Sequence, residues 1–135
     1  MKRSFAILSL LFVTFIFSFT GCTKQNDTTP ESVTRSSYLG TWNVSDSTLR
    51  QAYTVNITAD PNSSDGVFIS RFANLGSSAT AGAVIKGNSI ILDADQVISD
   101  IIINGSGTLS GTKINWQYTL NTGADLSTII AVYTK

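Results

Sequence analysis

Few side chains in this sequence are suited to catalysis. The chain contains no histidine, a single cysteine (Cys22), and no Gly-x-Ser-x-Gly pattern of the kind that presents a nucleophilic serine. A serine or cysteine nucleophile needs a base to accept its proton, and histidine is the usual one. Asp93 and Asp95 are the closest pair of candidate acid–base carboxylates, but their spacing beside a loop is typical of solvated surface groups. We therefore expect no enzymatic activity.

Oxygen ligands for a metal gather in one short segment, DPNSSDG, which runs from Asp60 to Gly66. Its spacing misses that of an EF-hand calcium loop by one residue, and Arg71 stands where such a loop needs a bidentate glutamate. A hairpin turn explains Pro61, Asn62 and Gly66 without an ion. The sequence also has no ligand set for zinc. We expect no metal and no other cofactor.

Cys22 has the clearest chemical role in the chain. It follows a basic N-terminus containing Lys2 and Arg3, and an uncharged apolar run at residues 4–19. That run is shorter than the ~20 residues of a membrane-spanning helix. A basic start, a short apolar run and a small residue before Cys22 predict a signal peptide over residues 1–21.

The residues Thr20, Gly21 and Cys22 resemble the lipobox of bacterial lipoproteins, with Phe19 in place of the usual leucine. The resemblance implies cleavage before Cys22 and a diacylglyceryl group on its thiol. Several acyl chains together give stable anchoring in a membrane. The resemblance to bacterial lipoproteins implies that this membrane is the cell outer membrane. The alternative is an ordinary signal peptide or signal anchor with an incidental cysteine. Whether the domain faces the periplasm or the cell surface stays open.

A polar segment separates this anchor from the rest of the chain. Residues 22–37 contain almost no large apolar side chains, which predicts a flexible tether. Residues 38–135 then form one small domain. Removing Lys2 and Arg3 from the nine basic residues leaves seven against nine acidic ones. With this weakly acidic balance and no basic stripe, we do not expect nucleic acid as a partner.

The domain has the alternating pattern of β-strands. In the segment INWQYTL, Ile114, Trp116, Tyr118 and Leu120 lie on one face and polar residues lie on the other. Alternation over seven residues indicates one buried and one wet face. Turn residues separate such segments, and the predicted strands are 40–46, 51–59, 66–72, 79–86, 89–92, 97–104, 113–121 and 127–134. A single eight-stranded antiparallel up-and-down barrel satisfies every strand and leaves no exposed edge.

Gly40, Thr41 and Trp42, at the start of the first strand, resemble the Gly-x-Trp motif of the calycin superfamily. The chain is most similar to small lipocalin-like outer-membrane lipoproteins, which share a lipobox, a polar tether, a YLGTW opening, an Asn-Leu-Gly segment, a Gly-Ser-Gly-Thr turn and a final YTK. The resemblance implies a structural role for Gly40 and Trp42 at one barrel end. Calycins often place a last-strand arginine over this tryptophan, and here only Lys135 is available.

The inward aromatic residues are candidates both for a ligand site and for a packed core. An eight-stranded barrel is just wide enough to be filled by its side chains or to hold one small ligand. The candidate ligand-binding residues are Tyr53, Val55, Trp116 and Tyr118. Buried phenols need hydrogen-bond partners, which favours a ligand or water beside them. Our leading hypothesis is non-covalent binding of a small hydrophobic or amphipathic molecule.

Some strands are apolar on both faces and support a second hypothesis. They include residues 67–69, 101–103 and 129–132, so one face of each must point outward. Outward apolar groups often form a contact surface. The alternative function is therefore an accessory or inhibitor module that binds a protein of the cell envelope without a ligand in its barrel.

Overall fold

Short β-strands make up most of the structure. The computed structural model describes residues 32–48 and 52–135. Within these residues the strands are β1 (Gly40–Asp46), β2 (Tyr53–Ala59), β3 (Gly66–Ser70), β4 (Thr80–Lys86), β5 (Ser89–Leu92), β6 (Gln96–Ile98), β7 (Ile101–Ser110), β8 (Lys113–Asn121) and β9 (Leu126–Thr134). Two short helices accompany them, the α-helix α1 (Arg35–Tyr38) and the 3-10 helix η1 (Phe72–Asn74).

The strands bury one face each, as the alternating sequence predicts. In β2, the side chains of Tyr53, Val55 and Ile57 are buried and the residues between them are exposed. β8 repeats this arrangement with Trp116 and Tyr118 inside. The buried side chains from all strands meet in one apolar core, which occupies the space that the strands surround.

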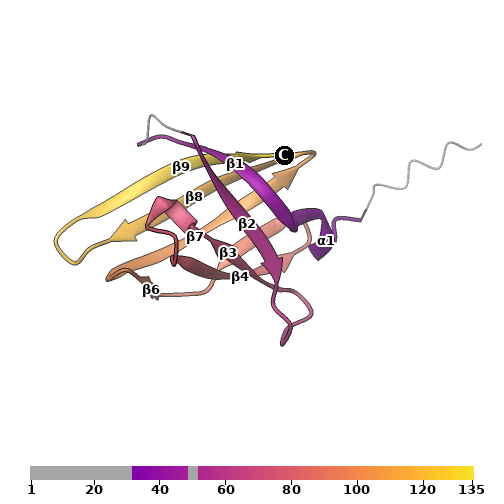
Figure 1. Ribbon diagram of the computed structural model, residues 1–135, viewed down its shortest axis with the longest axis horizontal. Helices are drawn as coiled ribbons and strands as arrows, with labels where there is room; N and C mark the ends of the chain where they lie inside the picture. The colour runs from indigo at the N-terminus through magenta and orange to yellow at the C-terminus, as the bar shows by residue number, and fades with distance from the viewer. Residues whose placement is uncertain (1–31, 49–51) are drawn as a thin grey trace, which may run out of the picture.

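Strand pairing closes the sheet on itself. The strands follow one another around the sheet in chain order, and every pairing is antiparallel. β9 returns to β1, with Tyr133 opposite Val44, and β5 pairs with β7, with Ile90 opposite Gly107. Strands β1–β5 and β7–β9 therefore form the predicted eight-stranded antiparallel closed barrel (Figure 1). The short strand β6 pairs only with the beginning of β7.

The predicted strand at 97–104 is wrong in its boundaries. The chain turns back inside it, so that β6 and β7 form a hairpin with Val97 opposite Ile102. Ser99 and Asp100 form the two-residue turn, with φ angles of 51° and 64°. Tight hairpins favour such left-handed residues, but their usual sequence signal is Asn-Gly or Asp-Gly. Ser-Asp gave no comparable signal.

The predicted turn at Gly105-Ser106-Gly107-Thr108 is also wrong, because these residues lie within β7. Gly107 faces Trp116 across the β7–β8 pair. A Cβ atom on Gly107 would lie 2.8 Å from side-chain atoms of both Ile114 and Trp116. This glycine therefore makes room for the indole ring, as glycines in strands often do where another group approaches closely.

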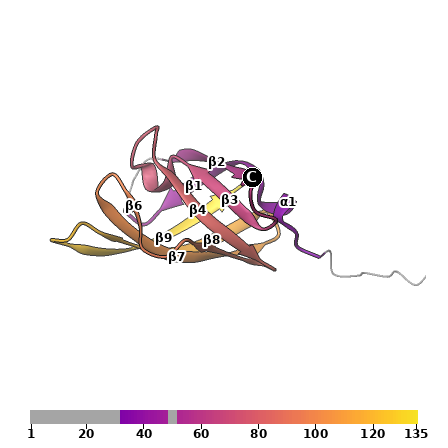
Figure 2. The ribbon, with the colours of Figure 1, turned by 90° about the horizontal axis from the view of Figure 1, so that it is seen from below.

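The two helices cover opposite ends of the barrel. α1 leads into β1 at one end, and η1 connects β3 to β4 at the end where β1 finishes and β2 begins (Figures 1 and 2). We call these the α1 end and the η1 end. The first three residues of α1 lie in the range predicted as a flexible tether (22–37), and the sequence pattern does not predict this helix.

Candidate functional site

Trp42 closes the α1 end of the barrel. Its indole is completely buried, and its Nε1 donates a hydrogen bond to the backbone oxygen of Tyr38 at 2.7 Å. The Tyr38 hydroxyl donates in turn to the backbone oxygen of Gly87 at 3.2 Å. Tyr38, the last residue of α1, thereby joins β1 to the β4–β5 turn.

Lys135 occupies the position over Trp42 where calycins often place an arginine. Its Nζ lies 4.5 Å from the centroid of the indole ring and donates to the backbone oxygen of Ser37 at 3.1 Å. A cation over an indole face is attracted by the negative face of the ring. Gly40 begins the strand with a φ of 113°, which side chains rarely adopt, beside the Lys135 side chain. These contacts fit the structural role that the resemblance implied for Gly40 and Trp42.

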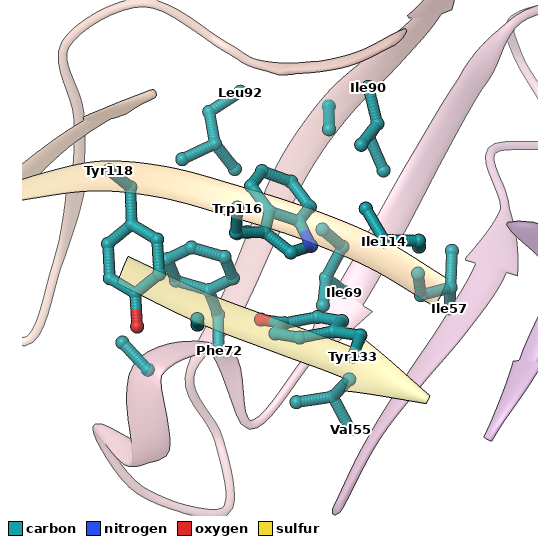
Figure 3. Packing of buried hydrophobic residues seen from close by; sticks show 14 of the residues in the cluster. Val55, Ile57, Ile69, Phe72, Ile90, Leu92, Ile114, Trp116, Tyr118 and Tyr133 are labelled. Atoms are coloured by element: carbon teal, nitrogen blue, oxygen red, sulfur yellow. The ribbon is translucent and has the colours of Figure 1, made fainter. Parts of the chain in front are cut away.

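An aromatic cluster fills the centre of the barrel. Trp116 lies 5.5 Å from Tyr133 and 6.5 Å from Tyr118, measured between ring centroids. Phe72 enters from η1 and lies 4.8 Å from Tyr118 and 5.9 Å from Trp116 (Figure 3). The tilted and edge-to-face arrangements are those that aromatic pairs prefer. We call Phe72, Trp116, Tyr118 and Tyr133 the aromatic cluster.

The sequence predicts two of the four residues of the aromatic cluster as site residues. Trp116 and Tyr118 were predicted site residues, and the structure places both inside, with Val55 and Tyr53 buried on the neighbouring strand β2. Tyr133 was missed although it alternates with Ile129 and Ala131 along β9. Phe72 was assigned to the end of a strand. Its signal was an aromatic residue directly before a turn, where polar residues are usual.

Three polar atoms in the interior have no hydrogen-bond partner among the described residues. They are the hydroxyls of Tyr53 and Tyr133 and the Nε1 of Trp116. A buried polar group that loses its partners costs about 1–3 kcal/mol. Most buried polar groups in proteins are therefore satisfied, and three exceptions in one small interior call for a physical reason.

The interior phenols hold their protons far above neutral pH. Burial raises the pKa of Tyr53 to about 12; the Asp46 carboxylate acts in the same direction and the nearby Tyr118 side chain opposes it. Burial also raises the pKa of Tyr118 and of Tyr133, and the neighbouring phenols and Asp46 add to the effect. At neutral pH these hydroxyls are therefore neutral hydrogen-bond donors, located toward the η1 end beside a carboxylate.

The carboxylates considered for catalysis lie on the surface. Asp93 and Asp95 are both exposed. Asp95 exchanges two hydrogen bonds with Asn104: its backbone nitrogen donates to Asn104 Oδ1, and its Oδ1 accepts from Asn104 Nδ2, each at 2.9 Å. Asp95 thus joins the β5–β6 connection to β7.

The positively charged side chain of Arg35 binds the Asp60–Gly66 segment. Arg35 in α1 donates from Nη1 to the backbone oxygens of Asp60, Ser63 and Gly66. The Asp60 carboxylate accepts from the backbone nitrogen of Asn62 at 2.8 Å, as in an Asx turn. In the described part of the chain, no group of three or more His, Cys, Asp and Glu side chains is placed to hold a metal ion.

The segments 67–69, 101–103 and 129–132, which are apolar on both faces, expose one large apolar side chain each. Phe68, Ile102 and Ile130 point outward, while their neighbours along each strand are buried or half-buried. Val97 and Leu126 near the η1 end are the most exposed, at 62% and 68%. Val97 lies opposite Ile102, and both Ile102 and Leu126 are opposite Asn121. We call Val97, Ile102 and Leu126 the outer apolar row.

The anchor predicted at Cys22 lies outside the described residues. Within the described ranges, no helix combines the length and the hydropathy needed to cross a bilayer. No protein family model matches the sequence, and neither a curated protein nor a solved structure matches it.

Proposed function

We propose that this protein is a lipid-anchored envelope protein whose lipocalin-like barrel binds a small molecule non-covalently. The observation that carries the proposal is the set of three unpartnered polar atoms, on Tyr53, Trp116 and Tyr133, inside an otherwise apolar interior. Binding sites for small molecules are typically apolar cavities with a few polar groups that fix orientation. A bound molecule with its own polar atoms would supply the missing hydrogen bonds.

The proposal is one of binding rather than catalysis. The interior polar groups are phenols and an indole, and the raised pKa values keep the phenols protonated at neutral pH. Protonated phenols and an indole N–H donate hydrogen bonds but do not accept a proton as a general base does. The ligand is therefore held by donors and leaves unchanged.

Native mass spectrometry of the full-length protein, extracted from its membrane in mild detergent, tests this function. We expect a low-mass adduct that survives gentle ionisation and is lost when the protein unfolds. The Tyr133→Phe variant keeps the ring and removes one unpartnered hydroxyl, so it should carry less adduct. Protein that is free of any adduct in both forms would contradict the proposal.

We also propose that Cys22 anchors the protein in the outer membrane. The support is the signal-peptide pattern and the resemblance of Thr20, Gly21 and Cys22 to a lipobox. Mass spectrometry of the N-terminal peptide should show a lipid on Cys22, and Cys22→Ser should move the protein to the soluble fraction. Protease treatment of whole cells then distinguishes a periplasmic from a surface-facing domain.

A second candidate function is binding to a protein of the cell envelope. The observation that favours it is the outer apolar row, in which Val97 and Leu126 are more than half exposed. Crosslinking in intact cells should then capture a single partner in fixed ratio, and Ile102→Asp should abolish the crosslink. Thr108→Asp is a suitable control because Thr108 is exposed on the same strand, away from the row.

A further inference from the structure

The segment that carries Phe72 has an unusual backbone. Arg71, Ala73 and Asn74 have φ angles of 57°, 51° and 54°, so three of four consecutive non-glycine residues are left-handed. A side chain makes this conformation unfavourable, and it persists only where the surroundings stabilise it. Such strain is found most often at binding sites and at segments that move.

The ring of Phe72 anchors this segment in the core, together with the buried side chains of Ala73 and Ala79. Phe72 is completely buried, with its ring against Trp116 and Tyr118. The hydrogen bond from its backbone nitrogen to Ala79 is long, at 3.4 Å, and so is the one from Ser99 Oγ to the Leu75 oxygen. Phe72 is thus the largest buried side chain of residues 71–79.

That ring leaves the polar groups around it unsatisfied. Figure 3 shows Phe72 rising from its helical turn toward Tyr118, Trp116 and Tyr133. A phenyl ring has no hydrogen-bonding atom, whereas Tyr133 and Trp116 each present an unpartnered donor in the same cluster. The ring of Phe72 packs well against the other aromatic rings, but it cannot accept hydrogen bonds from Tyr133 and Trp116.

We propose that Phe72 occupies the ligand site, and that the natural ligand is a neutral aromatic molecule with hydrogen-bond acceptors that replaces it. This inference rests on the proposed binding function and names its ligand class and its entry point. The ring of the ligand takes the position of the phenyl ring, and its acceptors meet the donors of Tyr53, Trp116 and Tyr133. Displacement of Phe72 also lets Arg71, Ala73 and Asn74 leave their left-handed conformation.

The electrostatics of the η1 end favour a neutral ligand over an anion. The Asp46 side chain lies near the phenols and accepts hydrogen bonds from the backbone and hydroxyl of Thr48 at 2.9 and 3.0 Å. An anionic ligand would lose its hydration inside an apolar barrel, where a buried charge is costly. Carbonyl, ether or amide oxygens offer acceptors without that cost.

Binding of acetophenone, with toluene as a matched probe that has no acceptor, tests the inference on the full-length protein in detergent. Titrations followed by NMR chemical shifts should show that acetophenone binds Phe72→Ala about tenfold more tightly than the wild type, because the competing ring is gone. Toluene should also gain from this change. Tyr133→Phe, introduced into Phe72→Ala, should weaken acetophenone about fivefold and leave toluene unchanged.

Amide hydrogen exchange of the wild-type protein tests the role of Phe72 even if the Phe72→Ala variant does not fold. Saturating acetophenone should increase amide exchange in residues 71–79 while the strands of the barrel become more protected. Unchanged or slower exchange in that segment would overturn the role of Phe72.

The outcomes separate this inference from the function on which it rests. A natural adduct in native mass spectrometry, with equal acetophenone affinity in wild type and Phe72→Ala, would leave the binding function standing and refute the inference about Phe72. A preference for acetophenone over toluene that survives loss of the Tyr133 hydroxyl would refute the proposed hydrogen bonds. Absence of both the adduct and probe binding would refute both proposals.

Discussion

Different kinds of contact close the two ends of the barrel. At the α1 end, the indole nitrogen of Trp42 and the hydroxyl of Tyr38 each donate to a backbone oxygen, and Lys135 covers the indole. At the η1 end, Phe72 closes the interior between residues with left-handed backbone, and polar atoms of Tyr133 and Trp116 have no partner among the described residues. The contacts at the α1 end stabilise the fold, whereas the left-handed backbone and the unpartnered polar atoms at the η1 end destabilise it.

This difference is informative because both ends use aromatic side chains of similar burial. Trp42 and Phe72 are both completely buried, so burial alone does not distinguish the two ends. The hydrogen bonding of the surrounding polar groups does. Natural proteins accept unsatisfied groups and strained dihedral angles mainly at functional sites, where stability is traded for binding.

Alkaline pH should have the largest effect, because ionisation of the buried phenols should destabilise the fold at the η1 end. A raised pKa in the folded state means that folding favours the neutral phenol. This stability is therefore complete below about pH 10, the unfolded pKa. It is lost as the pH rises through about 12, the pKa of Tyr53 in the fold. Phenolate absorbance and circular dichroism should change together in that range. Ionisation of the interior tyrosines near pH 10 with the fold intact would contradict their burial.

Trp42→Ala should have the largest effect of any single substitution. It removes a fully buried indole and its hydrogen bond to Tyr38, so the free energy of unfolding should fall by about 3–5 kcal/mol. Urea denaturation measures the loss. Trp42→Phe, which keeps a ring but removes the donor, should give an intermediate value. A loss below ~1 kcal/mol for Trp42→Ala would mean that the α1 end is not the stable one.

Phe72→Ala should cost less than Trp42→Ala, although Phe72 is equally buried. Loss of a buried phenyl ring costs roughly 3–5 kcal/mol, but release of the left-handed residues of the η1 segment should return part of it, leaving about 1–3 kcal/mol. The same denaturation measurement tests this. A cost equal to that of Trp42→Ala would show that the segment is not strained in the sense we describe.

Removal of single hydroxyls compares the two ends most directly. Tyr133→Phe removes a hydroxyl that has no partner among the described residues, so stability should stay equal or rise by up to ~1 kcal/mol. Tyr38→Phe removes a hydroxyl that donates to Gly87 and should cost about 1 kcal/mol. Thermal denaturation of Tyr133→Phe and Tyr38→Phe measures the sign of each change in stability. Equal losses at both ends would remove the distinction between them.

Lys135→Met is expected to give the smallest effect. It keeps much of the apolar stem over Trp42 but removes the charge above the ring, worth roughly 0.5–1 kcal/mol at an exposed site. Denaturation at low and high salt should both show the loss. Lys135→Arg serves as the control and should retain stability, because guanidinium also stacks on indole.

The barrel could be predicted from the sequence because its signals are local. The alternation in β2 and β8 and the turn at Gly87 and Asn88 lie within a few residues of the elements they specify. The position of Trp42 at a barrel end followed from the Gly-x-Trp resemblance. These features need no knowledge of distant neighbours.

The missed features depend on contacts between distant residues. Arg35 looks like part of a polar tether until the oxygens of Asp60, Ser63 and Gly66 are brought to it. Gly107 looks like a turn residue until Trp116 is placed across from it. The inward course of Phe72 rests on packing against β8 that overrides an unfavourable backbone.

The pairing of β1 with β9 has a consequence for the order of folding. The Thr134 hydroxyl donates to the backbone oxygen of Asn43, across 91 residues of chain. A chain that emerges from its N-terminus cannot complete the barrel until β9 arrives, and β1 keeps an open edge until then. Closing so long a loop carries an entropic cost and slows folding relative to proteins with local contacts. Folding therefore finishes at its last strand, and loss of β9 would leave two edges available for intermolecular pairing.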